Sequence, residues 1–141
     1  MAWWYLPAII LIAWIGSHII KEIAYIYRHR KFSWYTLFFE TGGMPSSHAA
    51  TVSAITMGVL LQEGFGALFW VCMVFSGVVI RDAMGVRKSV SDQAILLNKL
   101  VGKTKLHEKV SIVLGHTPLQ VFVGVIFGMG VAIGVWYGLV S

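Results

Sequence analysis

Four apolar stretches constrain the fold of this chain more than any other feature. They run from about residues 3 to 27, 46 to 61, 65 to 80 and 118 to 140. A helix of about 17–25 apolar residues crosses a bilayer, so the two central stretches are at the short end. With 57% hydrophobic and 12% charged residues, the chain is also too apolar for an ordinary soluble domain. We therefore predict an all-α, polytopic membrane helical bundle with about four transmembrane helices, forming one domain over residues 1–141.

The basic residues are confined to two segments of the chain. All eleven lysines and arginines lie within residues 21–31 and 81–109. By the positive-inside rule, both basic segments are cytoplasmic and both termini lie outside. A phosphate site would also concentrate cations, so the two explanations overlap. In either case, the alternation of helices brings residues 21–48 and 81–116 to the same membrane face.

Weaker helical patterns lie between the third and fourth apolar stretches. Residues 91–100 carry a narrow apolar stripe, which is typical of a helix lying on a membrane surface or docked on a core. A second short helix is expected over about residues 105–114. The single cysteine, Cys72, lies in the third stretch, so the sequence predicts no disulfide framework.

A turn-forming sequence, GGMPSSH at residues 42–48, leads directly into the second apolar stretch. Ser46 is a favourable N-cap, and the free amides of a first helical turn attract anions. The imidazole of His48, two residues further on, would lie beside an anion bound there. These residues therefore indicate half of a phosphate site.

A similar sequence, LGHTPLQ at residues 114–120, precedes the last apolar stretch. Thr117 at the N-cap, Pro118 at the first helical position and Gln120 two residues later form a capping box. This gives Gln120 a purely structural role as an alternative to a functional one. Because both helices begin at the same membrane face, two positively polarised helix starts are expected to converge, one with His48 and one with His116.

Charged residues also occur where apolar helices leave the membrane. Such residues are costly unless they are paired or functional, and Arg81 and Asp82 lie at such a point. Lys21, on the first stretch, is either a phosphate ligand or a side chain that snorkels to the interface. Membrane anchoring alone explains Arg87 equally well.

A metal site formed by Asp82 and Asp92 is a weaker reading of the same region. Arg81, Arg87 and Lys88 place three positive charges beside these carboxylates, which opposes a divalent cation. No closely spaced set of carboxylate, histidine or cysteine ligands is present in the sequence. We therefore expect no metal and no cofactor.

Four segments in order resemble the divergent PAP2 family of small membrane proteins, and the resemblance covers nearly the whole chain. The segments are residues 42–48, 81–87, 93–98 and 114–120. The family is related to type 2 phosphatidic acid phosphatases, whose motifs are KxxxxxxRP, PSGH and SRxxxxxHxxxD. In those enzymes the histidine of the third motif is the nucleophile and that of the second is the general acid, while lysines and arginines hold the phosphate.

The resemblance implies that His116 is the nucleophile and His48 the general acid, with Ser47 replacing the glycine of PSGH. Lys109 takes the place of the upstream arginine of the third motif. Gln120 takes the place of its aspartate and cannot supply a carboxylate. Lys21 and Arg28 have the spacing of the first motif, with Arg30 as an alternative cation, although His29 replaces the proline. The expected phosphate-binding residues are Lys21, Ser46, Ser47, Arg81, Arg87 and Lys109, supported by Asp82, Gln120, Arg28 and Arg30.

The activity implied by the resemblance is metal-independent hydrolysis of a phosphomonoester on a membrane lipid. The expected partners are a phosphorylated lipid and the bilayer, without nucleic acid. Since the familiar enzymes have six helices, a homodimer would complete the bundle, and Gly124, Gly128 and Gly130 permit close helix packing within or between subunits. Three alternatives stay open: a non-catalytic lipid-phosphate binding or transport protein, a metal-dependent phosphotransferase using Asp82 and Asp92, and a structural membrane subunit.

Overall fold

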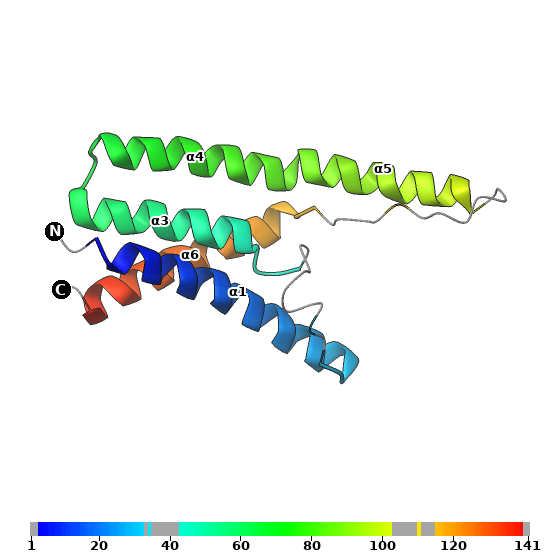
Figure 1. Ribbon diagram of the computed structural model, residues 1–141, viewed down its shortest axis with the longest axis horizontal. Helices are drawn as coiled ribbons and strands as arrows, with labels where there is room; N and C mark the ends of the chain where they lie inside the picture. The colour runs from blue at the N-terminus through cyan, green and yellow to red at the C-terminus, as the bar shows by residue number, and fades with distance from the viewer. Residues whose placement is uncertain (1–2, 33, 35–42, 103–109, 111–114, 140–141) are drawn as a thin grey trace.

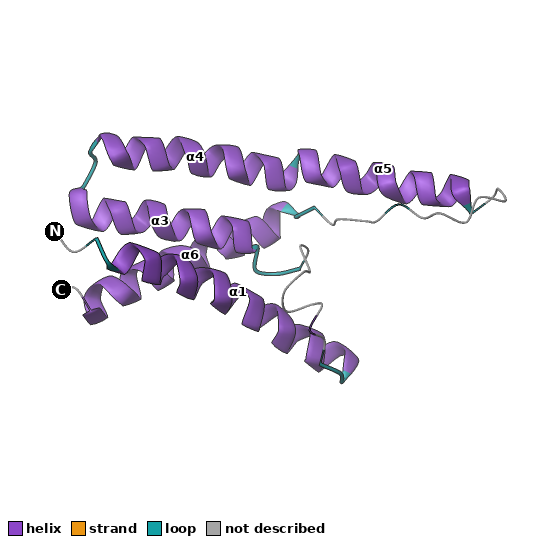
Figure 2. Ribbon diagram, in the orientation of Figure 1, coloured by secondary structure: helices purple, strands orange, loops and turns teal. Residues whose placement is uncertain are grey.

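Five α-helices make up the part of the chain that the structure describes, which is residues 3–32, 34, 43–102, 110 and 115–139 of a computed structural model (Figures 1 and 2). No strand occurs among these residues, so the predicted all-α fold is confirmed. The helices are α1 (Tyr5–His29), α3 (Ser47–Glu63), α4 (Ala67–Met84), α5 (Val86–Val101) and α6 (Pro118–Leu139).

Helix α3 is the centre of the bundle and contacts α1, α4 and α6. The start of α1, the end of α6 and the connection between α3 and α4 lie at one end of the molecule (Figure 1). The starts of α3 and α6 lie together toward the other end. The fold therefore gathers the two capped helix starts on the side opposite the two chain ends.

Three helical segments of the described chain are long and apolar enough to cross a membrane: α1, the nearly continuous run from Ala67 to Val101, and α6. Helix α3, which the sequence suggested as a fourth span, has only 17 residues and is not among them. The physical reason is its length, because 17 residues at 1.5 Å each span only about 25 Å, less than the bilayer core of about 30 Å. Its buried residues are mostly small, including Ala49, Ala50 and Ser53, because they face other helices rather than lipid.

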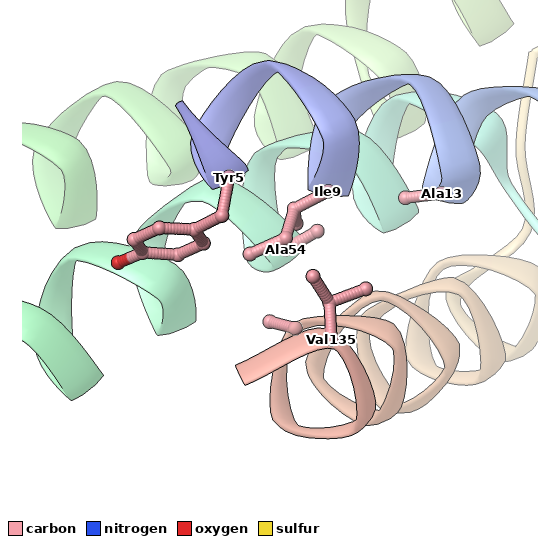
Figure 3. Close-up of a cluster of buried hydrophobic side chains, with 6 residues drawn as sticks. Tyr5, Ile9, Ala13, Ala54 and Val135 are labelled. Atoms are coloured by element: carbon pink, nitrogen blue, oxygen red, sulfur yellow. The ribbon is translucent and has the colours of Figure 1, made fainter. Parts of the chain in front are cut away.

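The hydrophobic core joins α1 to the middle of α3 and the end of α6 (Figure 3). Tyr5, Ile9 and Ala13 of α1 are completely buried against Ala54 and Val135. The Tyr5 hydroxyl donates a hydrogen bond of 2.7 Å to the carbonyl of Gly58, so the one polar atom that this ring carries into the core is satisfied. This contact fixes α1 against α3 at the end of the bundle where the chain begins.

Two glycines allow α6 to lie directly against α3. A Cβ atom at Gly124 would approach the carbonyl oxygen of Ser46 to 2.6 Å, and one at Gly128 would collide with the carbonyl of Ala50. Gly130 faces open space, so it does not take part in this contact. Close approach at Gly124 holds the second turn of α6 beside the N-cap of α3, which is where the candidate site lies.

Helix α5 continues α4 in almost the same direction and extends past the starts of α3 and α6 (Figure 1). It begins at Val86, not at residue 91 as the sequence suggested. Gly85 interrupts the helix only locally, because its N–H donates to Arg81 at 2.8 Å and its carbonyl accepts from the N–H of Ser89 at 3.0 Å. Of the short helix expected over residues 105–114, the structure describes only Val110, which is not helical.

Candidate active site

His48 and His116 lie side by side at the converging helix starts. Their ring centroids are 5.9 Å apart, and the ring planes are inclined by 61°. His48 belongs to the first turn of α3, whereas His116 lies in the extended segment just before α6. The two imidazoles are thus close enough to contact a single small anion, as the topology predicts.

The caps predicted for the two helices are both formed, and a backbone hydrogen bond joins them. The Ser46 hydroxyl accepts from the N–H of Ala49 at 3.4 Å at the start of α3. At the start of α6, the N–H of Thr117 donates to Oε1 of Gln120 at 2.9 Å, and the N–H of Gln120 donates to Oγ1 of Thr117 at 3.4 Å. The N–H of Ser46 donates to the carbonyl of Gln120 at 3.0 Å. This last bond fixes the distance between the two starts.

Lys21 brings a buried cation to the start of α3. Its side chain is only 4% exposed, and its Nζ atom donates to the Ser47 hydroxyl at 3.4 Å. Glu22, the next residue of α1, is equally buried, and neither side chain is free of other interactions. The positive charge of Lys21 therefore lies in a low-dielectric region beside the free amides of α3, where both favour an anion.

His116 is held by backbone contacts that the sequence does not reveal. Its N–H donates to the carbonyl of Ala83 at 3.1 Å, near the end of α4. A Cβ atom at Gly115 would collide with the backbone of Lys88 in α5, so only glycine lets the segment lie this close. The junction of α4 and α5 thus forms the support on which His116 rests.

The environment of His116 keeps its imidazole neutral. The residue is 1% exposed, and neither ring nitrogen has a hydrogen-bond partner within the described part of the chain. Burial, reinforced by the charge of Lys21, lowers the pKa of His116 to about 4, while the Gln120 side chain acts weakly in the opposite direction. At neutral pH the ring therefore carries a nitrogen lone pair in a site that excludes water.

Of the two arginines at the α4–α5 junction, Arg87 belongs to the histidine site. It forms an ion pair of 2.9 Å with Asp82, and its charge acts on His116. Arg81 instead lines a separate shallow pocket of about 670 Å³ formed with the α5 residues Ser89 and Gln93. The structure thus brings together Asp82 and Arg87, but not Arg81, with the two histidines.

The remaining predicted cations are spread more widely. Arg28 lies with Lys21 along a cavity of about 190 Å³ that also reaches Gly43 and Met44. Arg30 is not part of this cavity; it is exposed and ends α1 with its guanidinium 6.0 Å from the ring centroid of Tyr27. Lys109 lies outside the described residues. The structure therefore favours Arg28 over Arg30 as a neighbour of the site.

Asn98, part of one of the four family segments, has a structural role. Its side-chain amide donates to the carbonyl of Val110 and accepts from the N–H of Val110, both at 2.8 Å. These two bonds hold the backbone of Val110 against α5.

The site offers nucleophilic and cationic groups in place of clustered metal ligands. Within the ranges described, no group of three or more histidine, cysteine, aspartate or glutamate side chains is placed to hold a metal ion. Two imidazoles, a buried ammonium and two helix starts are instead suited to binding a phosphoryl group and attacking it.

Comparison with known proteins identifies the family of this chain. Residues 6–131 match the divergent PAP2 family. The uncharacterized membrane protein YuiD of Bacillus subtilis (strain 168) is 35% identical over 136 residues, which cover 84% of this chain and 85% of that protein. No solved structure matches the chain. With its apolar helices and this membrane-protein relative, the chain is an integral membrane protein and belongs to the divergent PAP2 family.

Proposed function

We propose that this protein is a metal-independent lipid phosphate phosphatase that works through a phosphohistidine. The observation that carries the proposal is the pair of imidazoles, 5.9 Å apart, in which His116 is buried and has no hydrogen-bond partner at either ring nitrogen among the described residues. A neutral, desolvated imidazole is a strong nucleophile, and a second imidazole beside it is placed to move a proton.

In the first step, a ring nitrogen of His116 attacks the phosphorus atom, and the bond between phosphorus and the lipid oxygen breaks. Burial, with the charges of Arg87 and Lys21, lowers the pKa of His48, whereas the negative charge of a phosphate bound beside the ring favours its imidazolium form. In that form His48 gives its proton to the lipid oxygen, so the lipid leaves as an alcohol. The helix amides, Lys21 and Arg87 stabilise the charge on the phosphoryl oxygens. In the second step, neutral His48 takes a proton from water, which attacks phosphorus, breaks its bond to His116 and releases inorganic phosphate.

The position of the site supports a lipid substrate. The histidines lie at the end of a bundle whose helices are apolar enough to cross a membrane, so a phosphate bound there is near the level of lipid headgroups. The positive-inside rule predicts that this end is cytoplasmic. Phosphatidate, phosphatidylglycerophosphate and polyprenyl phosphate all have the required chemistry.

The test is phosphate release from a panel of these lipids by the purified protein in detergent. We expect turnover that EDTA does not reduce, together with an acid-labile phosphate label on the protein. The correctly folded His116→Ala variant is expected to lose both. Near-wild-type turnover by this variant, or inhibition by EDTA that magnesium reverses, would contradict the mechanism.

The second candidate function is non-catalytic binding or transport of a lipid phosphate. Gln120 favours it, because this residue stands where the related enzymes have an aspartate, and its side-chain oxygen already accepts from the N–H of Thr117. A binder would retain labelled lipid phosphate at the site without releasing phosphate and without forming a phosphohistidine. The label on His116 therefore separates the two functions.

A further inference from the structure

A cavity of about 240 Å³ lies between α3, α4 and α6 and plays no part in the chemistry above. Its walls come from residues 53–60 of α3, 69–80 of α4 and 125–129 of α6. Helices α4 and α6 both pack on α3 but barely touch one another. The cavity is the groove that this arrangement leaves along α3.

The groove is apolar although three hydroxyl residues line it. The hydroxyl of Ser53 donates to the carbonyl of Ala49 at 2.7 Å, and that of Thr56 donates to the carbonyl of Val52 at 2.8 Å. Ser76 also donates to Val52, at 3.2 Å. Since these hydroxyls are satisfied by backbone carbonyls, the groove offers an occupant little besides hydrocarbon surface.

Three methionines, Met57, Met73 and Met129, form much of this hydrocarbon surface. Unbranched methionine side chains adapt to occupants of different shape. Met73 is 48% exposed and Met129 is 39% exposed, so the groove opens sideways between α4 and α6. In a bilayer this opening faces the lipid chains, which can enter without crossing water.

The groove does not include the histidines, but its near end starts at Ser53, about one and a half helical turns along α3 from His48, and it runs from there toward the membrane interior. On α4, Ile80 lines the groove and lies three residues before Ala83, whose carbonyl accepts from the N–H of His116. On α3, Ser53 follows His48 by about 8 Å and Leu60 follows it by about 18 Å, at 1.5 Å per residue. A lipid whose phosphate lies between the histidines would extend its tail in this direction.

We propose that the groove binds one hydrocarbon tail of the lipid whose phosphate lies between His48 and His116. This inference rests on the proposed function, because it assigns the substrate class of the same site. The protein then selects phosphomonoesters that carry a long apolar chain, and the tail positions the phosphate for attack by His116.

Filling the groove tests the inference. Met129→Trp and Met73→Trp place a bulky ring in it, and Val74→Trp is the matched control, because Val74 is 69% exposed and lines a different, lipid-facing patch. With alkyl phosphates of increasing length, we expect kcat/KM of the wild type to rise with tail length. For the longest tails, kcat/KM of the groove variants should be at least about tenfold lower than that of the wild type, since each buried methylene contributes about 0.8 kcal/mol. Turnover of p-nitrophenyl phosphate, which has no tail, should be unchanged.

If the wild type is active and kcat/KM depends on tail length equally in the groove variants and in Val74→Trp, the groove does not bind the tail. The proposed phosphatase function would be unaffected by that result. If the wild type hydrolyses neither substrate, the phosphatase proposal fails. The groove is then tested with an alkyl phosphate carrying a photoreactive tail, which we expect to label α3, α4 and α6 in the wild type and not in Met129→Trp. Labelling spread evenly over lipid-facing helices, or crosslinks to a second copy at this groove, would overturn the inference.

Discussion

Helices α3 and α6 begin side by side, yet they hold their histidines in different ways. His48 is part of the first turn of α3 and is only partly buried, although its Nδ1 atom is shielded from solvent. His116 precedes α6, is 1% exposed and is held through its own backbone by Ala83 and by the close contact of Gly115 with Lys88. Two similar sequence motifs therefore produce one fixed, dry imidazole and one more accessible imidazole.

This difference favours separate catalytic roles for the two histidines, one as nucleophile and one as general acid. A nucleophile benefits from a fixed position and a neutral ring, because both bring the lone pair to phosphorus without rearrangement. A general acid must instead regain a proton in each cycle, which is easier for the imidazole that solvent reaches. His116 has the first set of properties and His48 the second.

The largest expected effect comes from removing each histidine in turn. His116→Asn should abolish turnover of every phosphomonoester and the phosphate label, because no nucleophile is left. His48→Asn should reduce turnover of alkyl phosphates by about 10²–10⁴-fold, the usual contribution of acid–base catalysis. It should affect p-nitrophenyl phosphate much less, since that leaving group needs no proton. Equal losses with both leaving groups would contradict the assignment of His48 as the acid.

The next largest effect is expected from Gly115, whose close contact with Lys88 holds His116 in position. Gly115→Ala adds a Cβ atom that collides with the backbone of Lys88, so His116 must shift. A displacement of about 1 Å at a reacting group reduces turnover by about 10²-fold, and we expect a loss of this order in kcat. The control is Gly77→Ala, because a Cβ atom at Gly77 meets nothing within 4 Å. Unchanged kcat in Gly115→Ala would show that the fixed position of His116 is unimportant.

A smaller effect concerns stability in acid. Because the pKa of His116 is about 4 in the folded protein and 6.5 in an unfolded chain, the unfolded state binds more protons between these values. The contribution of His116 is therefore complete above pH 6.5 and is lost as pH falls, by about 2 kcal/mol between pH 7 and pH 5. Thermal unfolding in detergent should show a weaker pH dependence for His116→Asn than for the wild type. Identical slopes would mean that His116 is not held neutral.

The two helix starts follow from sequence because their signals are local. Ser46, Thr117 and Gln120 cap within their own helices, and alternation of the apolar stretches places both starts at one end. The choice between Arg81 and Arg87 is different. Arg87 follows Arg81 by six residues. At about 100° per residue, its side chain is rotated about the helix axis by one full turn plus about 240°, so the two side chains leave on different sides. Which of them reaches the histidines depends on how α4 packs on α3.

The contacts that hold His116 could not be predicted from the sequence either. Both contacts are made by backbone atoms, of Ala83 and of Lys88, so no side chain in the sequence indicates them. They form only because α5 continues α4 in almost the same direction. The sequence suggested that the helix after α4 starts at residue 91 and lies on the membrane or the core. A single glycine, Gly85, was too weak an interruption to turn the chain.

The smallest expected effects test Gln120, the residue in which this chain departs from the related phosphatases. Gln120→Ala removes the side-chain bond to the N–H of Thr117 and should cost about 0.5–2 kcal/mol in the free energy of unfolding, as other capping losses do. Gln120→Glu keeps the capping box, since glutamate is favoured at this position, and adds a negative charge near His116. That charge should raise the pKa of His116 and move the acid limb of kcat/KM to higher pH.

Turnover of these two variants shows whether the chain needs a carboxylate at position 120 for catalysis. If His116 is already positioned by its backbone, Gln120→Ala should change kcat only a few-fold and Gln120→Glu should increase it by a similar factor, because a carboxylate would merely add to an orientation that Ala83 and Gly115 provide. If instead the wild type is inactive and Gln120→Glu hydrolyses lipid phosphates, the chain needs the missing carboxylate and acts as a binder. The backbone support of His116, which has no counterpart at His48, is the reason to expect the first outcome.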